Sequence, residues 1–224
     1  MKFSKVLHAA VICGALIGFG GAKASVMTFN ATGNTGSILY STTQDGATLS
    51  ATMQFTLSTL SATSATFALN VSNNSTGPGT NTLMSFGIDS ISPLLTGAST
   101  TGGVWDASIN DTLPSFQTVD LCIWSSNNCS GGNINNGLGE GLSNTFSLTL
   151  TTAGNFTQGI SFTSPYGVKF QDVGNSGQSF EFAGCIAGTP GCGGGGQTEI
   201  PEPASIALVG LGLLGAAFAR RRRT

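Results

Sequence analysis

Residues 48–58 read TLSATMQFTLS and alternate almost perfectly between polar and apolar side chains. The apolar members share one parity: Leu49, Ala51, Met53, Phe55 and Leu57. A period of two over this length is typical of an antiparallel strand with one buried face. Turn-forming residues 61–64 follow, and the alternation resumes over 66–71. The two segments together predict a β-hairpin.

The rest of the body shows the same pattern in shorter pieces. We expect strands at 83–88, 119–124, 145–150, 159–163, 166–173 and 179–183, and a polar loop at 73–82. No stretch between residues 25 and 199 keeps the apolar period of 3.6 that a helix shows. Short strands separated by Gly- and Asn-rich turns favour an all-β fold, an antiparallel β-sandwich or jelly roll.

Lys169 and Glu181 alternate with apolar neighbours in two of these segments, so the pattern places both on a polar face. If the strands at 166–173 and 179–183 pair, the two side chains meet. An exposed pair of this kind contributes roughly 0.2–1 kcal/mol, so it indicates register more than stability.

Charge and histidine content exclude several functions. Only 8% of the residues are charged, against roughly 25% in an ordinary soluble protein. Residues 25–199 include nine acidic residues and only one basic residue, Lys169. This strongly acidic balance excludes a nucleic-acid-binding surface. The single histidine, His8, lies near the N-terminus, so the body has no Ser/His/Asp triad, Cys/His dyad or His-ligated metal site. We therefore expect no enzymatic activity.

The N-terminal residues have the layout of a secretory signal peptide. Lys2 and Lys5 precede an apolar run at 6–20, and Ala22 and Ala24 stand where a signal peptidase requires small residues. This predicts a signal peptide at 1–24, with cleavage before Ser25.

The C-terminal residues carry three ordered parts. These are Pro201, Glu202 and Pro203, then an uncharged, mostly apolar run at 204–219, then Arg220, Arg221, Arg222 and Arg223. Sixteen helical residues span about 24 Å, and arginines can extend such a helix by snorkelling. The run therefore predicts a transmembrane helix whose arginines act as a cytoplasmic stop signal. Read alone, it would also suit a plain membrane anchor.

These three parts resemble the PEP-CTERM sorting tail of Gram-negative bacteria, and the resemblance covers only the last 25 or so residues. It implies that an exosortase, an integral-membrane cysteine transpeptidase, recognises Pro201, Glu202 and Pro203. It further implies export across the inner membrane, transient residence there, and a final place at the cell surface or in the extracellular matrix with exopolysaccharide and biofilm. The expected division is a signal peptide (1–24), a β-sandwich ectodomain (25–192), a glycine-rich tether (193–199) and the sorting signal (200–224).

Four cysteines remain after the predicted cleavage: Cys122, Cys129, Cys185 and Cys192. An even number in an exported chain favours disulfides. Six residues, many of them turn formers, separate each successive pair, so we expect Cys122 with Cys129 and Cys185 with Cys192. The two cross-linked pairings remain alternatives. A four-cysteine zinc site would normally use shorter spacings.

An acidic loop, predicted from Trp105 to Asp120, supplies the remaining candidate site. The candidate residues are Trp105, Asp106, Asn110, Asp111, Asp120 and Trp124. Asp106, Asp111 and Asp120 suit calcium by their hard oxygen ligands, and the tryptophans suit a sugar cleft. The alternative is structural, with acids and amides starting turns and tryptophans in the core, and no calcium-loop spacing is present.

The sequence therefore favours a non-catalytic ectodomain that signal peptidase and an exosortase process and that stays near surface polysaccharide. We expect this ectodomain to need no cofactor. A calcium-dependent carbohydrate-binding module or adhesin is the alternative. A glycan-cleaving enzyme built on two carboxylates is a third hypothesis.

Overall fold

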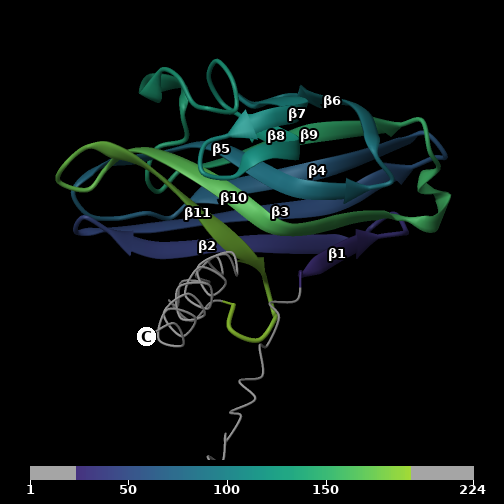
Figure 1. The fold of residues 1–224 in the computed structure, drawn as a ribbon, viewed down its shortest axis with the longest axis horizontal. Coiled ribbons are helices and arrows are strands. Elements are labelled where there is room, and N and C mark those ends of the chain that lie inside the picture. Colours follow the sequence, from purple (N-terminus) through teal and green to yellow (C-terminus); the bar gives the residue numbers. More distant parts are fainter. Residues whose placement is uncertain (1–23, 193–224) are drawn as a thin grey trace, which may run out of the picture.

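The computed structural model describes residues 24–192, which form an all-β domain (Figure 1). Its strands are β1 (Val26–Phe29), β2 (Thr35–Gln44), β3 (Ala47–Leu60), β4 (Ser64–Asn73), β5 (Gly79–Ser92), β6 (Leu95–Thr101), β7 (Asp106–Leu113), β8 (Gln117–Trp124), β9 (Ser143–Thr152), β10 (Ile160–Val173) and β11 (Gln178–Ile186). Two 3₁₀ turns, η1 (Ile134–Asn136) and η2 (Phe156–Gln158), complete the described elements. No helix within residues 24–192 is long and apolar enough to span a membrane.

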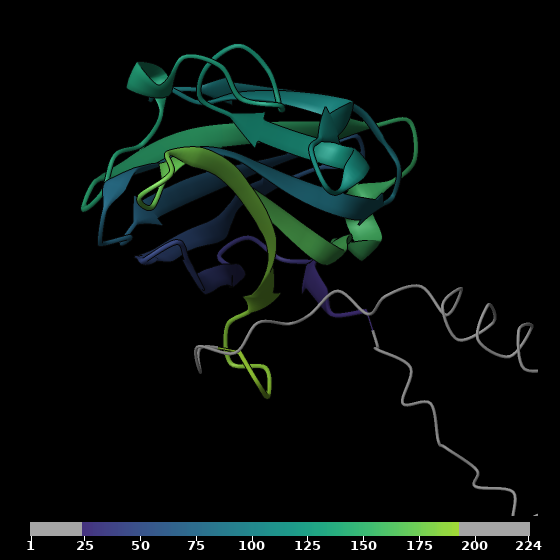
Figure 2. The same ribbon diagram turned by 60° about the vertical axis from the view of Figure 1, so that its left-hand side comes forward.

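The strands form one continuous antiparallel sheet in the order β6-β9-β4-β3-β2-β11-β10-β5-β8-β7, with β1 beside β10. The sheet folds over so that β2, β3, β4, β6 and β9 face β5, β7, β8 and β10 across a core (Figures 1 and 2). β11 joins the two halves, because it pairs with β10 through most of its length and with β2 at Cys185 and Ile186. The domain is thus a sheet that nearly closes on itself, rather than two separate sheets.

The hairpin predicted from residues 48–71 is confirmed as β3 and β4, which pair from Ala51 opposite Asn73 to Leu60 opposite Ala65. Burial follows the alternation: Leu49, Met53 and Phe55 are fully buried, while the polar residues between them face outward. Residues 48–58 therefore lie in a central strand of one half of the sheet, β3, between β4 and β2.

Other strands differ from expectation in extent. The segments predicted at 159–163 and 166–173 form one long strand, β10, which begins at Ile160 and whose register against β5 shifts between Thr163 and Tyr166. β5 begins at Gly79, so the loop expected at 73–82 is shorter. β1, β2, β6 and β7 were not predicted, because they are short or lack a clean apolar alternation.

An aromatic cluster holds the two halves together. Phe29, Phe55, Phe67 and Phe162 come from β1, β3, β4 and β10, and their ring centroids lie 5.0–6.1 Å apart. All four are fully buried. Because the cluster draws on strands from both halves of the sheet, it fixes how they face each other.

Candidate functional site

The sorting residues predicted from sequence lie outside the described residues. This applies to Pro201, Glu202 and Pro203, to the four arginines, to the tether at 193–199 and to the predicted helix at 204–219; Ala22 and most of the predicted signal peptide are likewise outside. The described part begins and ends on one side of the domain (Figures 1 and 2). There, the backbone N–H of Ser25 donates to Ser164 Oγ at 2.9 Å, and that of Ala187 donates to the carbonyl of Ser37 at 2.9 Å.

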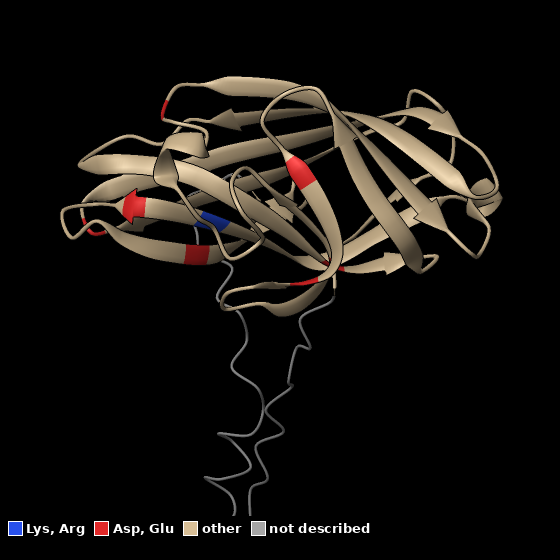
Figure 3. Ribbon diagram, turned by 90° about the horizontal axis from the view of Figure 1, so that it is seen from above, with Lys and Arg blue, Asp and Glu red and all other residues tan. Residues whose placement is uncertain are grey.

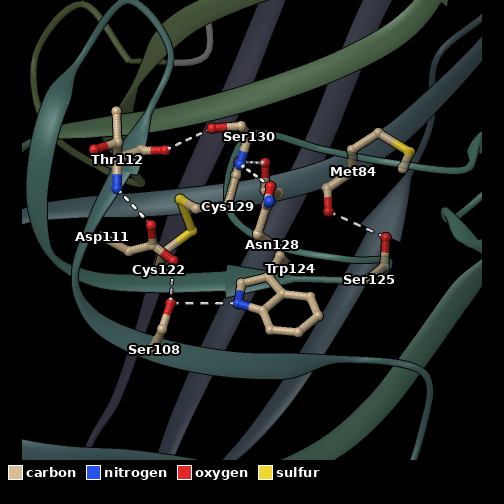
Figure 4. Close-up of a disulfide and its surroundings, with 11 residues drawn as sticks. Met84, Ser108, Asp111, Thr112, Cys122, Trp124, Ser125, Asn128, Cys129 and Ser130 are labelled. Atoms are coloured by element: carbon tan, nitrogen blue, oxygen red, sulfur yellow. Dashed lines mark hydrogen bonds between the residues drawn. A yellow bond between two sulfur atoms is a disulfide. The ribbon is translucent and has the colours of Figure 1, made fainter.

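Both predicted disulfides are present, Cys122–Cys129 and Cys185–Cys192, so the cross-linked pairings are wrong. Cys122–Cys129 is buried and closes the turn after β8 (Figure 4). Ser85 Oγ donates to the carbonyl of Cys129 at 2.8 Å, which ties this turn to β5. Cys185–Cys192 links the end of β11, the last described strand, to the turn that follows it.

Lys169 and Glu181 lie opposite each other on β10 and β11 and form an ion pair, as their alternation predicted. The expectation of an exposed polar face is wrong, because the two side chains are only 6% and 12% exposed. Gly131 of the disulfide loop lies against the Lys169 side chain. Ser115, from the turn between β7 and β8, donates its hydroxyl to Glu181 Oε2 at 3.3 Å. The pair is therefore covered from outside the sheet.

This cover extends over the outer side of β5 and β10. Leu113, Phe116, Val119, Cys122 and Cys129 form a small apolar cluster separate from the main core. Glycines at 87 and 167 make room for it: a Cβ at Gly87 would lie 2.8 Å from Leu113, and one at Gly167 would lie 2.9 Å from Phe116. The β7–β8 turn and the disulfide loop thus pack onto the outer face of this half.

The predicted acidic loop is a hairpin. Residues 106–113 and 117–124 pair as β7 and β8, with Asp106 opposite Trp124. Trp105 is 4% exposed and packs against Phe86 and Phe146 in the core, so it offers no face to a sugar. Trp124 is half-buried, and its indole N–H donates to Ser108 Oγ at 3.3 Å (Figure 4).

The three calcium candidates have separate hydrogen-bond partners. Asp106 accepts from the N–H of Ala107 at 2.8 Å, and Asp111 accepts from the N–H of Thr112 at 2.7 Å. Asp120 accepts from the N–H of Ile91 at 2.7 Å, so it joins β8 to the end of β5. Within residues 24–192, no three His, Cys, Asp or Glu side chains gather closely enough to hold a metal ion.

Asp89, which lies near Asp120, is expected to make the stability of the folded domain depend on pH. Burial raises the pKa of Asp89, and the nearby charge of Asp120 raises it further. A raised pKa in the folded state means that ionised Asp89 destabilises the fold above that pKa. This cost disappears as the pH falls below the ordinary value of about 3.9.

We therefore expect Asp89→Asn to raise the melting temperature at pH 7 by a small amount, because Asp89 is partly exposed. The gain should shrink as the pH is lowered toward 4, where the wild-type side chain protonates. Thermal unfolding across this pH range measures it. A lower melting temperature at pH 7 would contradict the sign.

A larger feature was not predicted from sequence: one side of the sheet presents a regular array of hydroxyl groups. The outward positions are the odd-numbered residues 35–43 of β2, 97–101 of β6 and 143–151 of β9, and the even-numbered residues 48–56 of β3 and 64–72 of β4. Of these 23 positions, 18 hold Ser or Thr. We call this surface the hydroxyl face.

The hydroxyl face contains no charge. None of the five strands β2, β3, β4, β6 and β9 contains an Asp, Glu, Lys or Arg residue. The charged residues of the described domain all lie on the other strands or in loops, and there are few of them (Figure 3). The hydroxyl face therefore differs from the outer side of β10 and β11, where the charged Lys169 and Glu181 lie beneath the β7–β8 turn and the disulfide loop.

Comparison with known proteins identifies the tail. Residues 199–223 match the family model of the PEP-CTERM protein-sorting motif. No curated protein and no solved structure matches the chain. The C-terminal segment of this chain is therefore a PEP-CTERM protein-sorting motif, which implies export and exosortase-dependent sorting to the surface of a Gram-negative cell.

Proposed function

We propose that this chain is a non-catalytic protein of the bacterial surface or extracellular matrix, which an exosortase delivers by processing its tail and which exopolysaccharide then retains. The observation that carries the proposal is the PEP-CTERM motif at residues 199–223. In this proposal the chain is the substrate of a membrane enzyme, and that enzyme carries out the reaction at the tail. The ectodomain therefore needs no catalytic activity of its own.

Features of the body support this role. Two disulfides suit an oxidising compartment outside the cytoplasm. The described residues contain no histidine, and their single lysine is held in an ion pair, which leaves few groups for acid–base chemistry. Both ends of the described domain leave from one side, so a tail held at the membrane would let the rest of the body project outward.

The sorting step is tested by replacing Pro201, Glu202 and Pro203 with alanine in the full chain. We expect most of the protein to move from the surface and matrix fractions to the membrane fraction, with its tail unprocessed. Proline lacks a backbone N–H and disfavours helix for the residue before it, so we expect the three alanines to remove the feature by which an exosortase would recognise the motif. Immunoblotting of the separated fractions measures the shift.

A matched control places three alanines in the tether, at Gly194, Gly195 and Gly196, and leaves the motif intact. This control should fractionate as the wild type does. An unchanged distribution of the motif variant would defeat the proposed function.

A further inference from the structure

We propose that the hydroxyl face binds an uncharged polysaccharide whose chains lie extended across the strands. The inference rests on the proposed function and adds to it a surface and a chemical class of partner. The alternative occupants are an acidic polysaccharide and a second copy of this chain.

Charge is the first argument for a neutral partner. The five strands of the hydroxyl face carry no ionic group, so a polymer can lie on it without stripping water from a charge, which is costly when the charge has no partner. An acidic polymer would find no cation there, and it would be repelled by a domain with eight acids and one lysine between residues 24 and 192.

Register is the second argument. Side chains line up across the strands in rows: Ser37, Gln54, Asn70 and Thr145 form one, and Leu39, Thr52, Ser72 and Ser143 form the next. Neighbouring strands lie about 4.8 Å apart, and outward residues on one strand repeat about every 6.7 Å. The face therefore offers donors and acceptors at regular intervals in two directions. A polymer that repeats its own hydroxyls can use many of them at once.

Preorganisation is the third argument. The hydroxyls of Ser72 and Ser143 share a hydrogen bond of 2.9 Å, those of Thr66 and Thr149 share one of 3.2 Å, and Asn70 Nδ2 donates to Thr145 Oγ1 at 3.2 Å. These contacts hold side chains in place before a ligand arrives, which lowers the entropy lost on binding. A hydroxyl has one donor and two acceptor positions, so each of these groups keeps capacity for a sugar.

The test uses the full-length chain in mild detergent, with insoluble cellulose as the uncharged probe and alginate beads as the acidic one. The face variant combines Gln54→Glu with Asn70→Asp. These two residues lie opposite each other near the middle of the array, and both changes keep the side-chain shape. The control variant combines Gln158→Glu with Asn127→Asp, which adds the same charge at exposed positions away from the face.

We expect the wild type and the control to bind cellulose, and the face variant to bind about tenfold more weakly, because a carboxylate must lose water to make the contact. Binding should survive added salt, and alginate should retain none of the three. Equal retention of the face and control variants would overturn the inference, as would absence of cellulose binding or salt-sensitive binding to alginate. A wild-type dimer in sedimentation that the face variant disrupts would assign the surface to self-association instead. Matching melting temperatures exclude misfolding.

The same face variant, expressed in the host, separates this inference from the proposed function. It should have its tail processed as in the wild type and then wash out of the matrix. If it stays in the matrix while the Pro201–Pro203 alanine variant is missorted, the sorting role stands and the role of the hydroxyl face does not.

Discussion

Replacing Phe162 with alanine is expected to lower the free energy of unfolding by about 3–5 kcal/mol. Phe162 is fully buried, and its ring centroid lies 5.3 Å from Phe29, 5.3 Å from Phe55 and 5.6 Å from Phe67. These partners come from three other strands, so the cavity would open between the two halves of the sheet and collapse poorly. Urea unfolding of the full chain measures the loss as a lower midpoint.

A matched control is Phe180→Ala on β11. Phe180 is an aromatic residue that packs at the edge of the core and stays half-buried. The same atoms are removed, but water already reaches the site, so the loss should be well below that of Phe162→Ala. Similar losses for the two variants would show that the Phe29, Phe55, Phe67 and Phe162 cluster does not hold the halves together.

The strands that enclose this cluster were the most predictable part of the fold. Phe55 and Phe67 each stand in a segment where large apolar residues recur at every second position, and the short turn between the segments favours a hairpin. Period-two alternation is a local signal, because it reflects one strand with one buried face. It therefore gives the strands and their inward residues, and the structure confirms both.

The order of the strands has no such local signal. β11 crosses from one half to the other and is partly buried on both sides, so its residues do not separate cleanly into inner and outer sets. β6 and β7, at the two ends of the sheet, contain few apolar residues, and β7 falls in the region predicted to be an acidic loop. Their pairing depends on neighbours distant in sequence.

The same limit explains what was and was not predicted about the candidate sites. The disulfides follow from short spacings around turns, which are local. The hydroxyl face needs five strands in a particular order and register before isolated Ser and Thr residues become an array. The burial of Lys169 needs a loop from 125–132 and a turn near Ser115 to fold over β10, and neither is near it in sequence.

The buried ion pair gives the second large expected effect: Glu181→Gln should lower the free energy of unfolding by about 3–5 kcal/mol. Gln keeps the shape of Glu and can still accept a hydrogen bond from Ser115. However, it leaves the Lys169 ammonium group nearly buried with no opposite charge. The loss measures the cost of that uncompensated charge, and urea unfolding at pH 7 reports it.

The double variant Lys169→Met/Glu181→Gln decides whether charge or packing is responsible. Met preserves most of the aliphatic stem of Lys169, which lies against Gly131, and removes the ammonium group. If the uncompensated charge is the cause, the double variant should recover most of the stability that Glu181→Gln loses, since two neutral partners need no mutual compensation. If the double variant is as unstable as Glu181→Gln alone, the loss comes from altered packing beneath the disulfide loop. The two side chains would then matter for filling the space between β10 and the disulfide loop, and their charges would not.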